Sequence, residues 1–235
     1  GAGRLLPNWR EHLVCQCGFG NRVRGAIHYL LGEVKPSPDA RLFITEQTTP
    51  LYAWVRSQYP QTVGSEYLGP DVAPGSQVRG YRHEDLEHLS FPDHRFDLVL
   101  SFDVLEHVAD AELAFRECLR CLKPGGVLLF TAPFTVNLEE HTVRATRRAD
   151  GSIAHLAEPA YHGHPVDPEG ASLCFRYFGW QLLSDLESYG FEEVRAVLYW
   201  SRELGYLGTE QILLTAKKPS VGAHSAREGP VREAP

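Results

Sequence analysis

The chain has 235 residues, of which 43% are hydrophobic and 23% are charged, a composition typical of one globular domain and unlike that of disordered or collagen-like chains. No stretch reaches the roughly 20 apolar residues of a membrane-spanning helix, and the first residues lack the apolar segment of a secretory signal peptide. We therefore expect a cytoplasmic protein without a membrane partner. The 30 acidic and 23 basic residues give a net charge of -7, which disfavours a nucleic-acid partner and favours a small molecule.

The beginning of the chain is interpreted as an N-terminal helical appendage over residues 4–40. Apolar side chains recur at helical spacing over residues 21–31, and the segment Lys35-Pro36-Ser37-Pro38-Asp39 then stops any helix. From residue 41 onward, strand and helix patterns alternate. Strands are expected over residues 41–45, 62–65, 77–81, 96–101, 127–131, 194–200 and 211–216, and helices over 50–59, 111–122 and 180–189.

This alternation predicts an α/β domain over residues 41–216, built on a doubly wound, mostly parallel seven-stranded sheet. The last two strands are expected to form a closing antiparallel hairpin. Residues 133–175 are polar, rich in His and Pro, and too long for a simple connection, so we expect an insertion that shapes a binding site. Residues 217–235 have little to bury and are predicted to be a disordered tail.

In such sheets, ligands bind outside the carboxyl ends of the strands. Glu66 follows the second strand, where an acidic side chain can accept hydrogen bonds from the hydroxyls of a ribose; the alternative is an exposed loop carboxylate. Asp85 follows the third strand and is placed to accept a hydrogen bond from an adenine amine, with Leu86 against the ring. The alternative for Asp85 is a helix N-cap.

Two motifs further along the chain are more specific. The strand Phe96-Asp97-Leu98-Val99 leads into a loop that ends in Leu105-Glu106-His107-Val108, and a helix ends in Leu122-Lys123-Pro124-Gly125-Gly126. This block resembles the later motifs of class I S-adenosylmethionine-dependent methyltransferases, and the resemblance extends over about residues 41–216. It implies a Rossmann-like fold, S-adenosylmethionine as cofactor, Glu66 at the ribose, and Asp85 with Leu86 around the adenine. It also implies that Phe102 and Asp103 border the methionine end.

The first motif departs from the family pattern, which has a glycine-rich loop after the first strand. Here the loop is Thr45-Glu46-Gln47-Thr48-Thr49-Pro50-Leu51, without glycine. Thr49 and Pro50 are nevertheless a good N-cap and first helical residue, and the helix N-terminus presents free N–H groups to a carboxylate. We expect Glu46 to bind the amino group of the methionine moiety and the Thr48 hydroxyl to replace a backbone contact.

The predicted insertion supplies candidates for the acceptor site. Methyl transfer to a hydroxyl needs a base, and His141 is our prediction for it, with His107 as the weaker alternative. Arg144 is expected to bind an acidic or phosphorylated acceptor. The remaining predicted acceptor-binding residues are Tyr161, His162 and His164.

The sequence does not predict a metal site, although two groups of residues contain possible metal ligands. His162, His164 and Asp167 together offer two imidazoles and a carboxylate, a possible ligand set for a divalent metal. Cys15 and Cys17 resemble half of a zinc site. Cys118 and Cys121 fit buried small residues better, and the odd total of five cysteines does not suggest a disulfide framework.

The sequence therefore predicts an S-adenosylmethionine-dependent methyltransferase of small-molecule biosynthesis, acting on an oxygen of a sugar or a specialised metabolite. Two alternatives stay open. One is a degenerate methyltransferase-like protein that binds without catalysis, suggested by the missing glycines. The other is an RNA methyltransferase with a zinc-knuckle appendage, which the net charge of -7 disfavours.

Overall fold

A six-stranded sheet forms the centre of the protein, with the strand order β13-β14-β6-β5-β1-β2. The computed structural model describes residues 9–163, 166 and 170–221. The strands of the sheet are β1 (Leu42–Ile44), β2 (Val63–Gly64), β5 (Phe96–Phe102), β6 (Leu122–Thr131), β13 (Glu192–Ser201) and β14 (Tyr206–Lys217). Strands β1, β2, β5 and β6 are parallel, whereas β14 is antiparallel to both β6 and β13. The predicted α/β fold with a closing antiparallel hairpin is confirmed.

The third predicted strand, residues 77–81, lies outside this sheet. It is instead a small hairpin of β3 (Gln77–Val78) and β4 (Tyr81–Arg82). Beyond β2, a single parallel bridge between Glu66 and His83 occupies the seventh position. The expected seven strands are thus six strands and one bridge within the described residues, because Tyr81 and Arg82, directly before His83, pair with β3 and not with the sheet.

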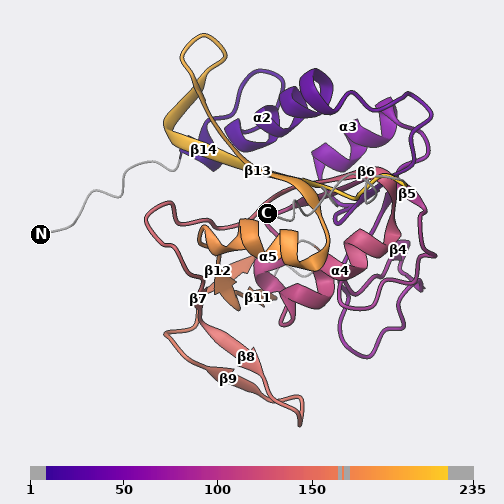
Figure 1. Ribbon diagram of the computed structural model, residues 1–235, viewed down its shortest axis with the longest axis vertical. Helices are drawn as coiled ribbons and strands as arrows, with labels where there is room; N and C mark the ends of the chain where they lie inside the picture. Colours follow the sequence, from indigo (N-terminus) through magenta and orange to yellow (C-terminus); the bar gives the residue numbers. More distant parts are fainter. Residues whose placement is uncertain (1–8, 164–165, 167–169, 222–235) are drawn as a thin grey trace, which may run out of the picture.

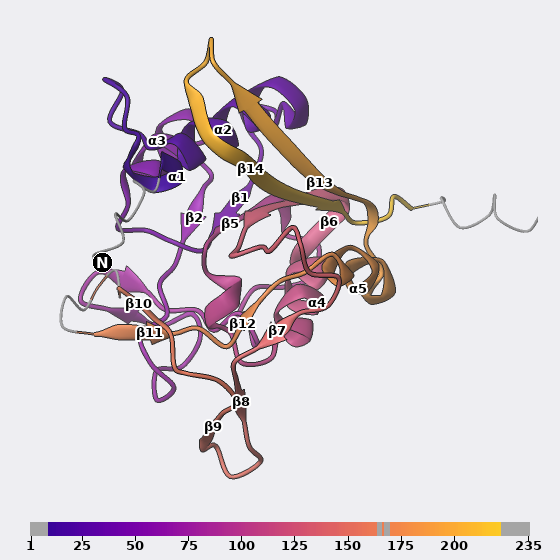
Figure 2. The same ribbon diagram turned by 90° about the vertical axis from the view of Figure 1, so that its left-hand side faces the viewer.

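Helices cover both faces of the sheet (Figures 1 and 2). The helices are α1 (Trp9–His12), α2 (Asn21–Tyr29), α3 (Pro50–Gln58), α4 (Ala111–Cys121) and α5 (Gln181–Tyr189). A π-helix over Leu30–Val34 continues α2, and a 3-10 turn over Leu105–His107 follows β5. Helices α2 and α3 lie on one side of the sheet and α4 and α5 on the other. None of the described helices is long and apolar enough to cross a membrane.

Two hydrophobic cores result, because successive side chains of a strand point to opposite faces. Phe43 of β1 packs in the core on the side of α4 and α5. Leu42 and Ile44 pack in the other core, which also contains Ala26 of α2 and Leu30. The N-terminal segment that was expected to be an appendage therefore closes one face of the sheet, and the domain boundary at residue 40 stays a prediction.

Helices α3 and α4 each begin at a capping side chain. The Thr49 hydroxyl accepts a hydrogen bond from the N–H of Tyr52, with Pro50 as the first residue of α3. The Asp110 carboxylate caps α4 in the same way through the N–H of Leu113. At the end of α4, the predicted stop signal is already part of β6, which starts at Leu122.

The insertion consists of short antiparallel strand pairs beside the carboxyl ends of the sheet. The pairs are β7 (Thr142–Val143) with β12 (Arg176–Tyr177), β8 (Ala145–Arg147) with β9 (Ile153–His155), and β10 (Tyr161–Gly163) with β11 (Ala171–Leu173). The β8–β9 hairpin projects away from the sheet (Figure 1). The tail predicted to be disordered lies outside the described residues after residue 221.

Candidate active site

A cavity of about 1370 Å³ lies at the carboxyl ends of β1, β2 and β5. Its wall is formed by the residues that directly follow these strands, by the turn after β4, and by the insertion. Six of the seven predicted cofactor residues line it: Glu46, Glu66, Asp85, Leu86, Phe102 and Asp103. This is the edge of an α/β sheet at which ligands bind.

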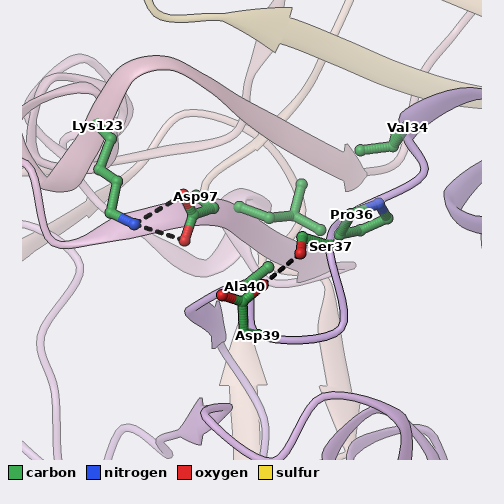
Figure 3. A pocket seen from close by; sticks show the side chains of 8 residues that line it. Val34, Pro36, Ser37, Asp39, Ala40, Asp97 and Lys123 are labelled. Atoms are coloured by element: carbon green, nitrogen blue, oxygen red, sulfur yellow. Dashed lines mark hydrogen bonds and ion pairs between the residues drawn. The ribbon is translucent and has the colours of Figure 1, made fainter.

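A second cavity of about 200 Å³ lies at the opposite edge, where β5 begins (Figure 3). Its wall contains the ion pair between Lys123 and Asp97, with nitrogen and oxygen 2.7 Å apart. None of the predicted site residues lines this smaller cavity. The two cavities are therefore separated by the length of the parallel strands.

Glu66 anchors the glycine-free loop after β1. It is only 4% exposed, and its Oε1 accepts hydrogen bonds from the N–H of Gln47 at 2.8 Å and from the N–H and hydroxyl of Thr48 at 3.1 and 3.0 Å. No hydrogen bond to its Oε2 occurs among the described residues. Thr48 itself does not line the cavity, so it acts on the site through Glu66.

The close approach that the family loop achieves with its own glycines is provided here by Gly64 of β2. A Cβ at residue 64 would lie 2.7 Å from the carbonyl oxygen of Glu46 and 2.6 Å from the ring of Tyr52. Only a residue without a side chain lets the loop lie this close to β2. The loop is thus compact although it contains no glycine.

Glu46 presents an unsatisfied carboxylate in this cavity. Its Oε1 is buried and has no hydrogen-bond partner among the described residues. Burial raises the pKa of the Glu46 carboxyl above its usual range, and the charge of Arg22 and a hydrogen bond with Thr49 oppose that shift only in part. A buried carboxylate oxygen without a donor is costly, so the site suits a ligand that brings a cation or a hydrogen-bond donor.

Asp103, in contrast, is fully engaged by the N-terminal segment. The Arg10 guanidinium binds both carboxylate oxygens at 2.7 and 2.8 Å, Arg22 lies 3.2 Å away, and the Thr131 hydroxyl donates a hydrogen bond at 2.8 Å. Burial alone would raise the pKa of Asp103, but Arg10 and Arg22 outweigh it and hold that pKa below its usual range. Asp103 also has a left-handed backbone with φ of 54°.

Asp85 and Leu86, which are predicted to lie around the adenine, form part of a turn. The Asp85 Oδ1 accepts a hydrogen bond from the N–H of Glu87 at 2.9 Å, so it stabilises a turn and does not cap a helix. Leu86 is 7% exposed and belongs to a hydrophobic core. Both residues line the cavity.

Two histidines line the opposite wall, on the side of the insertion. The Nδ1 of His162, from β10, lies 3.0 Å from the Nε2 of His107, which follows β5. The Glu106 carboxylate beside them raises the pKa of His162 above its usual value, although burial opposes the shift. Within the described residues, His107 and His162 are the histidines that reach the cavity.

Other predicted acceptor residues lie away from the cavity. The Nε2 of His141 is 2.8 Å from the Asp185 carboxylate, and its Nδ1 accepts a hydrogen bond from the N–H of Gly179. Arg144 stacks over the ring of Tyr177 at 4.9 Å. The side chains of these two residues and of Tyr161 do not line the cavity, and His164 lies outside the described residues. Their predicted roles stay predictions.

Three side chains at this site are only weakly indicated by the sequence, or not at all. His107 is only the weaker candidate for a base, and neither Arg22 nor Glu106 has a role in the prediction from sequence. The sequence signal for the first and third was the LEHV segment itself, since it directly follows a strand that ends at the binding edge. For Arg10 and its pairing with Asp103, 93 residues apart, no local signal exists.

The structure does not support a zinc site at Cys15 and Cys17. Cys15 and Cys17 form a disulfide with each other, so neither thiolate is left to bind a zinc ion. The cysteine spacing did not suggest a disulfide. Cys118 and Cys121 are free and buried, as predicted. Burial raises the pKa of both thiols, which is typical of packed, unreactive cysteines.

Comparison with known proteins agrees with the fold. Residues 57–130 match the family model of a methyltransferase domain. A Mycolicibacterium smegmatis protein named "Probable S-adenosylmethionine-dependent methyltransferase" is 44% identical over 79 residues, which are 31% of this chain and 30% of that protein. A Sinorhizobium medicae protein named ubiquinone biosynthesis O-methyltransferase is 27% identical over 153 residues, which are 53% of this chain and 62% of that protein.

A solved structure shows the same fold. It belongs to the complex between the Haloferax volcanii Trm112 methyltransferase activator and a methyltransferase; the TM-score is 0.51 at 15% identity, over 84% of this chain and 94% of that chain.

The sheet order and the cavity at its carboxyl edge agree with the fold of class I S-adenosylmethionine-dependent methyltransferases, and residues 57–130 resemble a methyltransferase domain. S-adenosylmethionine is the cofactor of this class, as the motifs after β5 and α4 implied. This chain spans less than two thirds of the length of the two curated relatives described above.

Proposed function

We propose that this chain transfers a methyl group from S-adenosylmethionine to an oxygen of a small molecule. The observation that carries the proposal is the single cavity whose wall holds Glu66, Asp85 and the unsatisfied Glu46 at the carboxyl edge of the sheet. These three carboxylates follow three different strands, and all three line the cavity.

The residues present fit this cofactor. It carries an ammonium group and a sulfonium, both cationic, and the cavity wall is acidic on the side of β1 and β2. The buried Oε1 of Glu46 lacks a donor, which the ammonium group would supply as a charge-assisted hydrogen bond. The Oε2 of Glu66 is left for a ribose hydroxyl, because the loop uses only Oε1.

The chain's contribution to the reaction is positioning. The cofactor, when bound, supplies an electrophilic methyl carbon on a cationic sulfur. Glu66 and Asp85 hold the adenosine end and Glu46 the amino-acid end, so the direction of the methyl group is fixed from both sides. An in-line displacement gains most of its acceleration from such alignment at about 3–3.5 Å.

The acceptor is proposed to enter from the insertion side. There the wall contains His107, His162, Tyr67 and Arg147, which suit a hydroxylated molecule. Arg147 forms an ion pair with Glu87 across the cavity wall. The name of the Sinorhizobium medicae relative supports oxygen as the acceptor atom; a sugar or a specialised metabolite is our finer proposal.

Isothermal titration with S-adenosylhomocysteine tests the cofactor half of the proposal. We expect saturable binding that is lost or strongly weakened in Glu66→Ala and unchanged in Glu112→Gln, an exposed carboxylate of α4. Absence of binding at millimolar ligand would reject the proposal in favour of a degenerate, non-catalytic fold. That alternative has one observation in its favour, namely that Arg10 and Arg22 already occupy Asp103.

A further inference from the structure

Three potential metal ligands converge at the insertion side of the cavity. They are Glu106, His107 and His162, and each offers one atom within 4.8 Å of the others. His162 Nδ1 and His107 Nε2 lie 3.0 Å apart, and the Glu106 Oε1 lies 3.6 and 3.7 Å from them. Glu106 and His107 are adjacent in sequence, whereas His162 arrives from β10 in the insertion.

The Glu106 carboxylate is the unusual member of this group. It is fully buried, at 0% exposure, and neither of its oxygens has a hydrogen-bond partner among the described residues. The separations of 3.6 and 3.7 Å from the two histidines are too long for hydrogen bonds. A buried carboxylate without donors is strongly unfavourable, so a cation is expected against Glu106.

The His107 ring is already held as metal ligands usually are. Its Nδ1 lies 2.8 Å from the carbonyl oxygen of Leu173, which can only accept, so Nδ1 carries the proton. This leaves the lone pair of Nε2 directed at Glu106 and His162. Metal-binding histidines commonly donate their other N–H to a backbone carbonyl, which fixes the tautomer and the ring.

We propose that Glu106, His107 and His162 bind one divalent transition-metal ion of the zinc or cobalt type. The point equidistant from the three ligand atoms lies about 2.0 Å from each of them, which is the bond length of zinc to imidazole nitrogen and carboxylate oxygen. Two imidazoles with one carboxylate are a ligand set of catalytic metal sites that keep open positions. Because His107 and His162 line the cavity, the open positions face it.

The role of the metal rests on the proposed methyl transfer and adds a substrate class to it. An ion here binds the oxygen of a hydroxylated acceptor and lowers the pKa of that hydroxyl. The proton leaves to water, the oxygen forms a bond to the methyl carbon, and the carbon–sulfur bond breaks to leave neutral S-adenosylhomocysteine. Acceptors with two neighbouring oxygens, which can chelate the ion, are the class we expect.

The test uses the full chain without an affinity tag, treated with EDTA and then titrated with Co²⁺ and Zn²⁺ in the absence of thiols. We expect one bound Co²⁺ with visible absorption bands, and a rise in unfolding temperature with Zn²⁺. Glu106→Gln and His162→Gln should each weaken binding at least about tenfold. His155→Gln, an exposed histidine of the same insertion, is the matched control and should bind as the unchanged protein does.

Two outcomes overturn the proposal. One is no metal binding in the unchanged protein, which would leave a protonated His162 as the cation beside Glu106. The other is metal binding that Glu106→Gln and His162→Gln leave unchanged, since the ion would then lie elsewhere. Glu106→Gln keeps the size of the side chain, and His162 is an exposed residue, so both variants are expected to fold; their circular dichroism spectra check this.

Failure of this site and failure of the proposed function are distinguishable. S-adenosylhomocysteine that binds to a protein without metal affinity would reject the metal and leave the cofactor site intact. Metal that binds to a protein without S-adenosylhomocysteine affinity would reject methyl transfer and leave the metal site. Both titrations are made on the same variants.

Discussion

Glu66 and Thr48 are joined by two hydrogen bonds, both to the Glu66 Oε1: the backbone N–H of Thr48 donates at 3.1 Å and its hydroxyl at 3.0 Å. The residue predicted to hold a ribose therefore also holds the loop that replaces the glycine-rich motif. One carboxylate oxygen serves the protein and the other is left for a ligand. Loop geometry and cofactor affinity are consequently coupled through a single side chain.

Removing the Glu66 carboxylate should affect both the loop after β1 and the affinity for the cofactor. We expect Glu66→Ala to weaken S-adenosylhomocysteine binding by about 1–3 kcal/mol, the range for losing charged hydrogen bonds, and to lower the unfolding temperature. Thr48→Val removes one hydrogen bond and keeps the carboxylate, so it should cost less in both measurements. Equal affinities of Glu66→Ala and the unchanged protein in calorimetry would exclude Glu66 from the cofactor site.

The space beside Gly64 can be tested separately. Gly64→Ala places a methyl group 2.7 Å from a backbone oxygen of Glu46, and overpacking of this kind costs about 1–3 kcal/mol. Gly32→Ala is the control, because its methyl group would meet its nearest neighbour at 3.7 Å. Urea unfolding of both variants measures the difference, and equal stabilities would show that the loop can move away from β2 freely.

Cofactor affinity should depend on pH through Glu46. Burial raises the pKa of this carboxyl, and only its ionised form can pair with an ammonium group. Affinity for S-adenosylhomocysteine should therefore increase as pH rises from the usual glutamate range toward neutrality. In Glu46→Gln this pH dependence should disappear and the affinity at neutral pH should fall; a variant with an unaltered pH profile would assign the effect to another group.

The Arg10–Asp103 contact should stabilise the fold except in acid. The pKa of Asp103 is held below its usual range by Arg10 and Arg22, against the effect of burial. The folded state thus favours the ionised carboxylate, and the contribution is complete above the unfolded-state pKa of about 3.9 and is lost as pH falls through the lower folded pKa.

Asp103→Asn tests the direction of this pH dependence of stability. Its unfolding free energy should lie below that of the unchanged protein at pH 7, and the gap should narrow as pH falls below about 4. Asp71→Asn, at an exposed position, provides the comparison. A gap that widens in acid would contradict the inferred direction of the shift.

His141→Ala separates two interpretations of this residue. If His141 is the catalytic base, the substitution should lower turnover far more than it lowers stability. The hydrogen bonds of His141 to Asp185 and Gly179 predict the reverse, a loss of about 1–3 kcal/mol in unfolding free energy with S-adenosylhomocysteine affinity retained. We expect the second result. A fully stable variant with low turnover would restore His141 as the base.

Much of the fold was determined by local sequence. The apolar run Phe96–Phe102 is a strand and the capping pair Thr49-Pro50 begins a helix, as local sequence predicted, because caps and short apolar runs depend on neighbouring residues. The parallel order of the strands then brings Glu46, Glu66, Asp85 and Asp103 to one edge. The LEHV and LKPGG segments predicted the class of the domain, which the family match agrees with.

Tertiary structure alone decided which distant side chains meet. His162 reaches His107 across 55 residues, and Arg10 reaches Asp103 across 93. His141, closer in sequence to β6, is instead held by α5. The path of a long insertion is set by how its hairpins pack against the sheet, and no periodicity along the chain records that packing. The sequence therefore determined at which edge of the sheet the cavity lies, whereas the tertiary structure determined that His107 and His162 line it.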